Sequence, residues 1–433
     1  MSLSSGILRS SFGNAIPPLA ALATQPILAH ALGVAGRGEV AAATAPLMLG
    51  VAALTLGLPE GATFAVARRQ RGLRLPVALA MLLLLSVGIA GCLVIGMLAD
   101  LLSGGDPALA AMIVLASCAM APALLVSLVR GVFAGLLDWS RIAWERTLAS
   151  VLRLVGVAAL AVVGELTPLS ATLVIAASTF LGGVVYLIPA RRREISHGPL
   201  LHEPIHPKAT LPGLLGYAIR HWFGGLAGVV LMRVDQVLMT PLSSVSELGL
   251  YAIAVSVSEV VLVFNSAVRE VIFASQASSV DMTRAATAAR VSTLVTIFVS
   301  IGVAAMSPLV FPILFGTQFS DAVPVTWVLL LAIVVGNPGS VAGSLLAARN
   351  RPEARSASIV VGAAMNVVLV FALVPQLGAI GAAAATFAGN AIAGTMNVIW
   401  LRALFKVPPS EYYLLRVDDI RTTVTALRRM LRI

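Results

Sequence analysis

The chain has 433 residues, of which 59% are apolar and only 11% are charged. Soluble domains carry about 25% charged residues, so this composition excludes a water-soluble globular protein. The mean hydropathy of +0.97 indicates that most of the surface faces hydrocarbon. A formal net charge of +10 raises nucleic acid as a partner. The placement of the basic residues between apolar segments points to a membrane instead, and we expect no nucleic-acid binding.

Long apolar windows alternate with short charged or Gly/Pro-containing stretches along the whole chain. A helix needs about 20 apolar residues to cross a hydrocarbon core about 30 Å thick. Twelve windows reach that length, at residues 9–31, 39–67, 75–99, 108–135, 143–163, 169–190, 213–240, 248–275, 291–314, 323–347, 356–375 and 379–403. The sequence therefore predicts an all-α integral membrane protein with 12 transmembrane helices.

Basic residues are distributed unevenly between the two sides of this topology. If the N-terminus is cytoplasmic, 22 of the 29 Lys and Arg residues fall in inner segments or in the C-terminal tail, and one, Arg37, falls in an outer loop. Cationic loops are translocated poorly, so this asymmetry predicts that both termini are cytoplasmic. Ala29-His30-Ala31 imitates a signal-peptidase site, and cleavage of the first window as a signal peptide stays an alternative.

A weak internal repeat relates the two halves of the chain. The segment around Gly38 recurs around Gly249 at an offset of 211 residues, and residues 130–134 match residues 342–346 at an offset of 212. Halves of six spans each insert in the same orientation. The repeat therefore predicts two six-helix lobes related by a pseudo-twofold axis along the membrane normal, with a cavity between them. Chance similarity between two Ala/Leu/Gly-rich halves is the alternative.

The repeat and the charge pattern divide the chain into four parts. We expect an N-terminal lobe at 1–190, a cytoplasmic linker at 191–212, a C-terminal lobe at 213–403 and a cytoplasmic tail at 404–433. Apolar residues of the tail recur at helical spacing beside five arginines, which predicts an amphipathic helix lying on anionic lipid headgroups. A coiled-coil seam is the alternative interpretation of the same apolar stripe.

Four stretches of the chain carry a resemblance to a known family. They are Leu32-Gly33-x-x-Gly36-x-Gly38, Arg233-Val-Asp235 followed by residues 248–254, residues 314–322, and residues 345–350. In order and spacing they resemble the polysaccharide and oligosaccharide flippases of the MOP superfamily, which also contains the MATE exporters and the lipid II flippases. The resemblance spans nearly the whole chain.

This resemblance implies a function. It implies a MATE-like transporter that moves an undecaprenyl-diphosphate-linked oligosaccharide across the cytoplasmic membrane of a bacterium by alternating access, for surface polysaccharide biosynthesis. The partners would be this lipid-linked oligosaccharide and membrane lipids, with sodium or proton coupling left open. No cofactor is expected. The sequence combines no nucleophile, base and orienting residue, so we do not expect an enzyme.

Two departures from related branches favour the oligosaccharide branch. Lipid II flippases usually carry two further helices after the twelfth, and no such windows follow here. MATE exporters usually place an acidic cation ligand in the first helix, where this chain offers Asn14, Gln25 and His30. The alternatives are a MATE-like cation-coupled multidrug exporter and, beyond it, a lipid II flippase or a membrane glycan polymerase.

Ionisable residues inside the predicted spans are the candidate site residues. Such a group at the bilayer centre costs about 2.5 to 3.5 kcal/mol on insertion scales, so it normally faces a partner or a water-filled cavity. Arginines near an inner helix end, such as Arg130 and Arg146, are expected to snorkel instead. The candidate substrate-binding residues are Glu60, Arg153, Arg220, Arg233, Asp235, Glu259 and Arg269.

The candidate arginines suit the diphosphate that the resemblance implies. A guanidinium presents its donors as a planar fork, which matches phosphate oxygens. Arg220 and Arg233, with Arg153 and Arg269 as weaker candidates, would provide the positive potential. Asparagines within the spans, among them Asn390, would present amides to sugar hydroxyls or would bond helix to helix.

The candidate acidic residues have two possible uses. Glu60, Asp235 and Glu259 would hold the arginines in place, contact sugar hydroxyls, or titrate if transport is coupled to an ion. An interhelical ion pair that only fixes packing is the structural alternative for Arg233, Asp235 and Glu259. Glu60 lies in Gly57-Leu-Pro59-Glu60-Gly61, which predicts a broken helix, because proline removes a backbone donor and glycine loosens the backbone.

Two features of the sequence suggest metal or redox chemistry and are not expected to carry it. His202-Glu203-Pro204-Ile205-His206 spells the pattern of a zinc protease, but its proline makes a continuous helix unlikely there, and we expect no metal site. Cys92 and Cys118 are the only two cysteines and lie in apolar windows, which excludes a disulfide framework.

Overall fold

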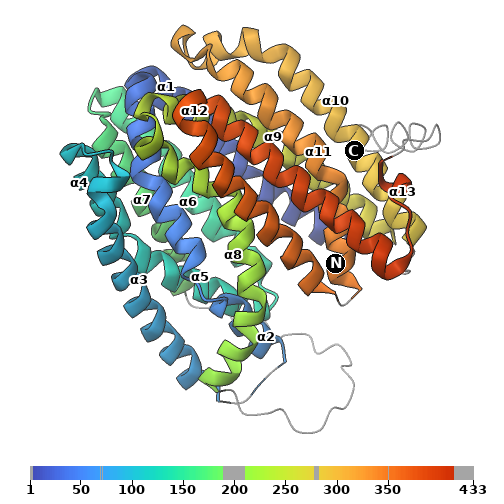
Figure 1. Ribbon diagram of the computed structural model, residues 1–433. Helices are drawn as coiled ribbons and strands as arrows, with labels where there is room; N and C mark the ends of the chain where they lie inside the picture. The colour runs from blue at the N-terminus through green and yellow to red at the C-terminus, as the bar shows by residue number, and fades with distance from the viewer. Residues whose placement is uncertain are drawn as a thin grey trace. The chain divides into compact units, whose positions relative to one another are not determined.

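The computed structural model describes residues 3–68, 70, 72–188, 210–276, 282–349 and 351–413 (Figure 1). Every regular element in these ranges is helical, which confirms the all-α prediction. The helices are α1 (Leu3–Ala53), α2 (Leu58–Ala67), α3 (Arg74–Leu102), α4 (Pro107–Ser117), α5 (Met120–Gly135), α6 (Trp139–Val163), α7 (Pro168–Leu181), α8 (Leu211–Leu242), α9 (Val245–Gln276), α10 (Met282–Leu314), α11 (Ala322–Ala348), α12 (Pro352–Phe405) and α13 (Ser410–Tyr413), with short 3-10 helices at Gly182–Leu187 and Thr317–Phe319.

The outer surface of the helices suits a hydrocarbon solvent. Within the described ranges, ten helical segments are long and apolar enough to cross a membrane. Large apolar side chains stay exposed along them, as on α3, where Leu82 is 62% exposed and Met97 is 83% exposed. Such a continuous exposed apolar surface marks contact with lipid or with another protein. The chain is therefore an all-α membrane protein with many spans.

The helices form two compact units. The N-terminal unit consists of Met1–Ala31 and Ala43–Leu226, and the C-terminal unit consists of Leu32–Ala42 and Ala227–Ile433. The residues of α1 and of α8 are divided between the two units. Most of the predicted linker at 191–212 and the predicted amphipathic tail helix lie outside the described residues.

Both of the longest helices contain a single residue with non-helical backbone. This residue is Gly33 (φ 66°) in α1 and Gly378 (φ 53°) in α12. A positive φ strains residues with a Cβ, so glycine suits both positions. After Gly378 the helix restarts, and the backbone N–H of Ala379 donates to Oε2 of Glu247 at 2.7 Å. A carboxylate at a helix start satisfies a free backbone donor and favours the positive end of the helix dipole.

The predicted helix break before Glu60 is confirmed. The turn between α1 and α2 places Leu56 (φ 50°) and Gly57 (φ 67°) in the left-handed region. A Cβ on Gly57 would lie 2.4 Å from the carbonyl oxygen of Ala218, so the chain needs glycine for close packing as well as for its backbone angle. The indole N–H of Trp222 donates to the carbonyl oxygen of Ala53 at 2.7 Å, which satisfies an acceptor freed by the break.

The two glycines that the repeat aligns pack against each other's helices. A Cβ on Gly38 would lie 1.9 Å from the carbonyl oxygen of Val245, and a Cβ on Gly249 would lie 2.2 Å from the carbonyl oxygen of Val34. Val34 and Val245 are separated by the same 211 residues as the glycines. The second part of α1 and the start of α9 therefore meet backbone to backbone, in a reciprocal contact that only glycine permits.

Candidate functional site

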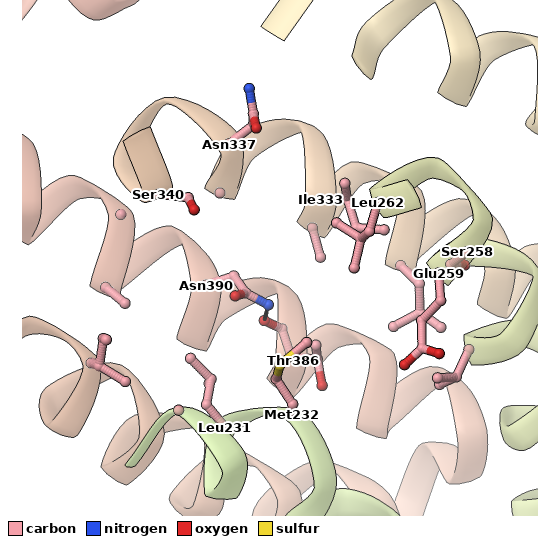
Figure 2. A pocket seen from close by; sticks show the side chains of 18 of the residues that line it. Leu231, Met232, Ser258, Glu259, Leu262, Ile333, Asn337, Ser340, Thr386 and Asn390 are labelled. Atoms are coloured by element: carbon pink, nitrogen blue, oxygen red, sulfur yellow. Dashed lines mark hydrogen bonds between the residues drawn. The ribbon is translucent and has the colours of Figure 1, made fainter. Parts of the chain in front are cut away.

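A cavity of about 320 Å³ lies inside the C-terminal unit, and we call it the C-unit cavity. Side chains from α8, α9, α11 and both parts of α12 line it. Figure 2 shows the polar residues Glu259, Ser340 and Asn390 among apolar neighbours such as Leu231 and Ile333. Apolar walls with a few convergent polar groups are typical of a ligand site.

One end of the C-unit cavity holds the buried carboxylate of Asp235. Its Oδ2 accepts hydrogen bonds from the hydroxyl of Tyr251 and from the hydroxyl of Thr386, the latter at 2.9 Å. Its Oδ1 accepts from the backbone N–H of Gln236 at 2.7 Å. A buried carboxylate is costly unless it is hydrogen-bonded, and three donors meet this requirement here. Asp235 thus ties α8 to α9 and α12 through neutral donors.

Two of the candidate residues form an ion pair beside Asp235. Nη2 of Arg233 lies 3.1 Å from Oε1 of Glu259, and this pair joins α8 to α9. The side chains are 39% and 41% exposed, and Glu259 lines the C-unit cavity. Arg233 and Asp235 lie only two residues apart but have different partners, because that interval places them on different faces of a helix. The pair leaves both charged groups open to a ligand.

Three asparagines line the middle and the far end of the C-unit cavity. The amide nitrogen of Asn337 donates to the hydroxyls of Ser292 and Thr293, at 2.7 and 2.9 Å. The amide nitrogen of Asn390 donates to the carbonyl oxygen of Thr386 at 3.0 Å, and that of Asn397 donates to the carbonyl oxygen of Gly339 at 3.1 Å. The bonds of Asn337 and Asn397 join neighbouring helices, whereas that of Asn390 lies within α12.

The remaining candidate residues lie away from this cavity or outside the described side chains. Glu60 is exposed in the first turn of α2. Arg153 is half-buried on α6, and its Nε is buried with no hydrogen-bond partner in the part of the chain that the structure describes. The side chains of Arg220 and Arg269 lie outside the described residues. The structure thus brings together Arg233, Asp235 and Glu259 of the seven candidates.

The prediction that Arg130 snorkels is wrong. Its Nε and Nη2 contact the two carboxylate oxygens of Glu145, both at 2.9 Å, and the Glu145 side chain is 3% exposed. The hydroxyl of Tyr186 donates to the same carboxylate at 3.4 Å. A bidentate fork is the strongest geometry for an arginine and a carboxylate. Arg130 points inward because a buried carboxylate without a cation costs more free energy than the partial removal of the Arg130 guanidinium from water.

The described residues hold no cluster of three or more His, Cys, Asp or Glu side chains that is arranged to bind a metal ion. The segment from His202 to His206 lies outside them. The site residues that sequence reasoning missed are Tyr251, Thr386 and Arg355. Tyr251 lies within residues 248–254, which carry part of the family resemblance, and no short-range pattern marks the other two.

Solved structures of membrane transporters share the fold of this chain. The lipid II flippase MurJ in an inward closed conformation has a TM-score of 0.70, at 15% identity over 97% of this chain and 91% of that chain. An inward-facing multidrug resistance MATE family transporter has a TM-score of 0.66, at 17% identity over 90% of this chain and 94% of that chain. A MOP superfamily transporter from Pyrococcus furiosus has a TM-score of 0.58, at 16% identity over 92% and 94%. These likenesses establish the fold.

The sequence of the chain matches a protein family. The profile of polysaccharide biosynthesis proteins matches residues 3–273, which is more than half of the chain. The chain therefore belongs to the polysaccharide biosynthesis protein family and has the MOP transporter fold, which confirms the family resemblance of the four sequence stretches. Among curated protein sequences no match was found.

Proposed function

We propose that the protein is a flippase that moves an undecaprenyl-diphosphate-linked oligosaccharide across the cytoplasmic membrane of a bacterium. The observation that carries the proposal is the match of residues 3–273 to polysaccharide biosynthesis proteins in a chain with a transporter fold. Surface glycans are assembled from lipid-linked units made inside the cell, so their synthesis requires a step that moves these units outward. We infer a transporter rather than an enzyme.

The proposed mechanism is alternating access between two lobes of six helices. Support comes from the breaks at Gly33 and Gly378, because counting α1 and α12 as two crossings each turns the ten candidate spans into twelve. The two parts of α12, residues 352–377 and 379–405, each exceed the about 20 residues that one crossing needs. An even number of crossings would put both termini on the same side of the membrane, and the charge asymmetry favours the cytoplasmic side.

Arg233 is the residue on which the proposal is tested first. Its guanidinium is partly exposed beside the C-unit cavity and would attract the diphosphate, while Glu259 would hold it in place. Asp235 would titrate or bind sodium if transport is coupled to an ion. We predict that Arg233→Ala abolishes export of the glycan at normal abundance of the protein in the membrane.

The control variant is Arg351→Ala, because Arg351 is exposed and pairs only with its neighbour Glu353, at 3.6 Å. The measurement is surface polysaccharide together with the lipid-linked precursor on the cytoplasmic side. Loss of the first with accumulation of the second in a strain without the protein supports the flippase. Intact glycan with changed drug susceptibility would indicate an exporter instead, and precursor that is flipped but not polymerised would indicate a polymerase. Full export by Arg233→Ala removes Arg233 from the proposal.

A further inference from the structure

A glycine of α8 keeps the C-unit cavity open. Gly228 lines the cavity, and a Cβ built on it would meet no atom within 4 Å. Glycine weakens a helix interior relative to alanine, so a glycine needs a reason at this position. Gly38 and Gly249 have such a reason, because other helices touch their backbones. No atom of the described residues lies within 4 Å of the Cβ position at Gly228, so the missing side chain leaves room inside the cavity.

A residue that lines the same cavity carries a buried acceptor without a partner among the described residues. Asn397 is 5% exposed and lines the cavity, and its Oδ1 has no hydrogen-bond partner in the part of the chain that the structure describes. The bond from its amide nitrogen to Gly339 fixes which end of the amide is the oxygen. A buried acceptor left unpaired is costly, so a donor from a ligand would be favoured here.

A cation lies next to this acceptor. Arg355, in the first turn of α12, also lines the C-unit cavity. A Cβ on Gly343 would lie 2.7 Å from the amide nitrogen of Asn397 and 3.3 Å from Cγ of Arg355, so the two side chains share this corner. Arg355 has no ion-pair partner among the described residues. The corner therefore offers one positive charge and one unpaired acceptor to the same ligand.

The polar groups that line the cavity extend from Asn397 toward Asp235. Thr386 lies 11 residues before Asn397 on α12, which is about 16 Å along the helix axis. Asn390 lies between them and also lines the cavity. Its amide nitrogen already donates to the carbonyl oxygen of Thr386, so its amide oxygen is the group that it can offer to a ligand. A volume of about 320 Å³ is at the lower end of the range for ligand pockets. That space fits one small polyhydroxylated unit rather than a whole oligosaccharide.

We propose that the C-unit cavity binds one sugar unit together with an adjacent anionic group, with Arg355 on the anion and Asn397 and Asn390 accepting from the sugar hydroxyls. This inference rests on the proposed flippase function and names the part of the substrate that the site recognises. The anion is either the phosphate that joins the sugar to the lipid or the carboxylate of an acidic sugar. The two sources have the same chemistry at Arg355, and they are separated by the choice of probe.

The binding test uses the full chain in lipid nanodiscs and titrates three probes: a hexose 1-phosphate, the matching uronic acid and the matching neutral hexose. We expect one of the two anionic probes to bind more tightly than the neutral sugar, and its identity gives the source of the anion. Arg355→Ala should weaken that binding by at least about tenfold, because a charge-assisted hydrogen bond is lost. Arg351→Ala, one helical turn away and outside the cavity, should bind as the unchanged chain does. Equal binding of all three probes, or of none, overturns the proposal.

The second pair of variants tests the cavity itself. Gly228→Leu fills it and should abolish binding, whereas Gly225→Leu should bind normally, because Gly225 is also open around its Cβ but does not line the cavity. If Gly228→Leu does not yield folded protein, Gly228→Ala carries the test, since its methyl group meets no atom within 4 Å and still narrows the space. Normal binding by the folded variant overturns the proposal.

Transport separates this inference from the flippase proposal. In liposomes that contain a lipid-linked oligosaccharide, the unchanged chain and Gly225→Leu should flip it, and Gly228→Leu and Arg355→Ala should not. Normal flipping by all four overturns the cavity as a substrate site and leaves the flippase standing. If the unchanged chain binds the anionic sugar but flips no lipid-linked glycan, the proposed function fails although the cavity takes the predicted ligand.

Discussion

In the N-terminal unit, the buried Glu145 meets Arg130 through two hydrogen bonds of 2.9 Å, whereas in the C-terminal unit the buried Asp235 meets the hydroxyls of Tyr251 and Thr386. Both carboxylates join neighbouring helices. They differ in the charge of their partners, and only Asp235 lines the C-unit cavity.

This difference shows how one type of residue serves two purposes. A carboxylate paired with arginine has its charge balanced by that arginine. Removing the carboxylate leaves an unpaired cation in a site that held an ion pair. A carboxylate held by hydroxyls has neutral partners, and Asp235 lines the C-unit cavity. Position in a membrane span is therefore no guide to function without the identity of the partner.

The largest expected effect is on the N-terminal pair. We predict that Glu145→Ala lowers the free energy of unfolding by about 3 kcal/mol, because it leaves Arg130 without its partner in a largely buried site. Thermal unfolding in detergent measures it. The double variant Arg130→Leu with Glu145→Leu should recover most of the loss, since it removes both charges. A double variant as unstable as Glu145→Ala would show that the charges are not the cause.

A smaller effect is expected for the hydroxyl that holds Asp235. Tyr251→Phe keeps the ring and removes one donor to the carboxylate, which should cost about 1.5 to 3 kcal/mol. Tyr186→Phe is the matched control, because its bond to Glu145 is long at 3.4 Å and Glu145 keeps both bonds to Arg130. Equal losses in the two variants would erase the contrast between the units. The same unfolding measurement applies.

The smallest effect on stability is expected at the partly exposed pair of the C-terminal unit. Glu259→Gln should change the free energy of unfolding by less than about 1 kcal/mol, because both partners are about two-fifths exposed and well solvated ion pairs contribute little. Glycan export by the same variant should nevertheless fall, since Glu259 would no longer hold Arg233. A large loss of stability with normal export would make this pair structural.

The paired residues could in part have been found from the sequence. Two antiparallel helices joined by a short turn bring residues at similar distances from the turn opposite each other. Arg130 lies five residues before the end of α5, and Glu145 lies six after the start of α6. Asp235 lies seven residues before the end of α8, and Tyr251 lies six after the start of α9. The near-equal distances appear only with the helix ends of the structure, because the predicted windows begin at 143 and 248 and place Glu145 and Tyr251 two and three residues from the window start.

Other parts of the site depend on packing that no local pattern records. Thr386 lies 151 residues from Asp235, and their contact exists because α12 packs beside α8 and α9 in the C-terminal unit. Arg355 lies between the predicted windows 323–347 and 356–375, so the sequence predicts a loop position for it, although α12 begins at Pro352. Hydropathy predicts which segments span the membrane. Which residues line a cavity depends instead on which helices are neighbours.

The reciprocal contact of Gly38 and Gly249 constrains how the two copies of the repeat can diverge. Each glycine faces a backbone carbonyl of the other copy, on Val245 and Val34, and a carbonyl group cannot be made smaller by any substitution. A clash caused by a larger residue at one position therefore cannot be relieved by a substitution at the other position. The match of the two halves at an offset of 211 residues thus coincides with a contact in which each matched position needs glycine.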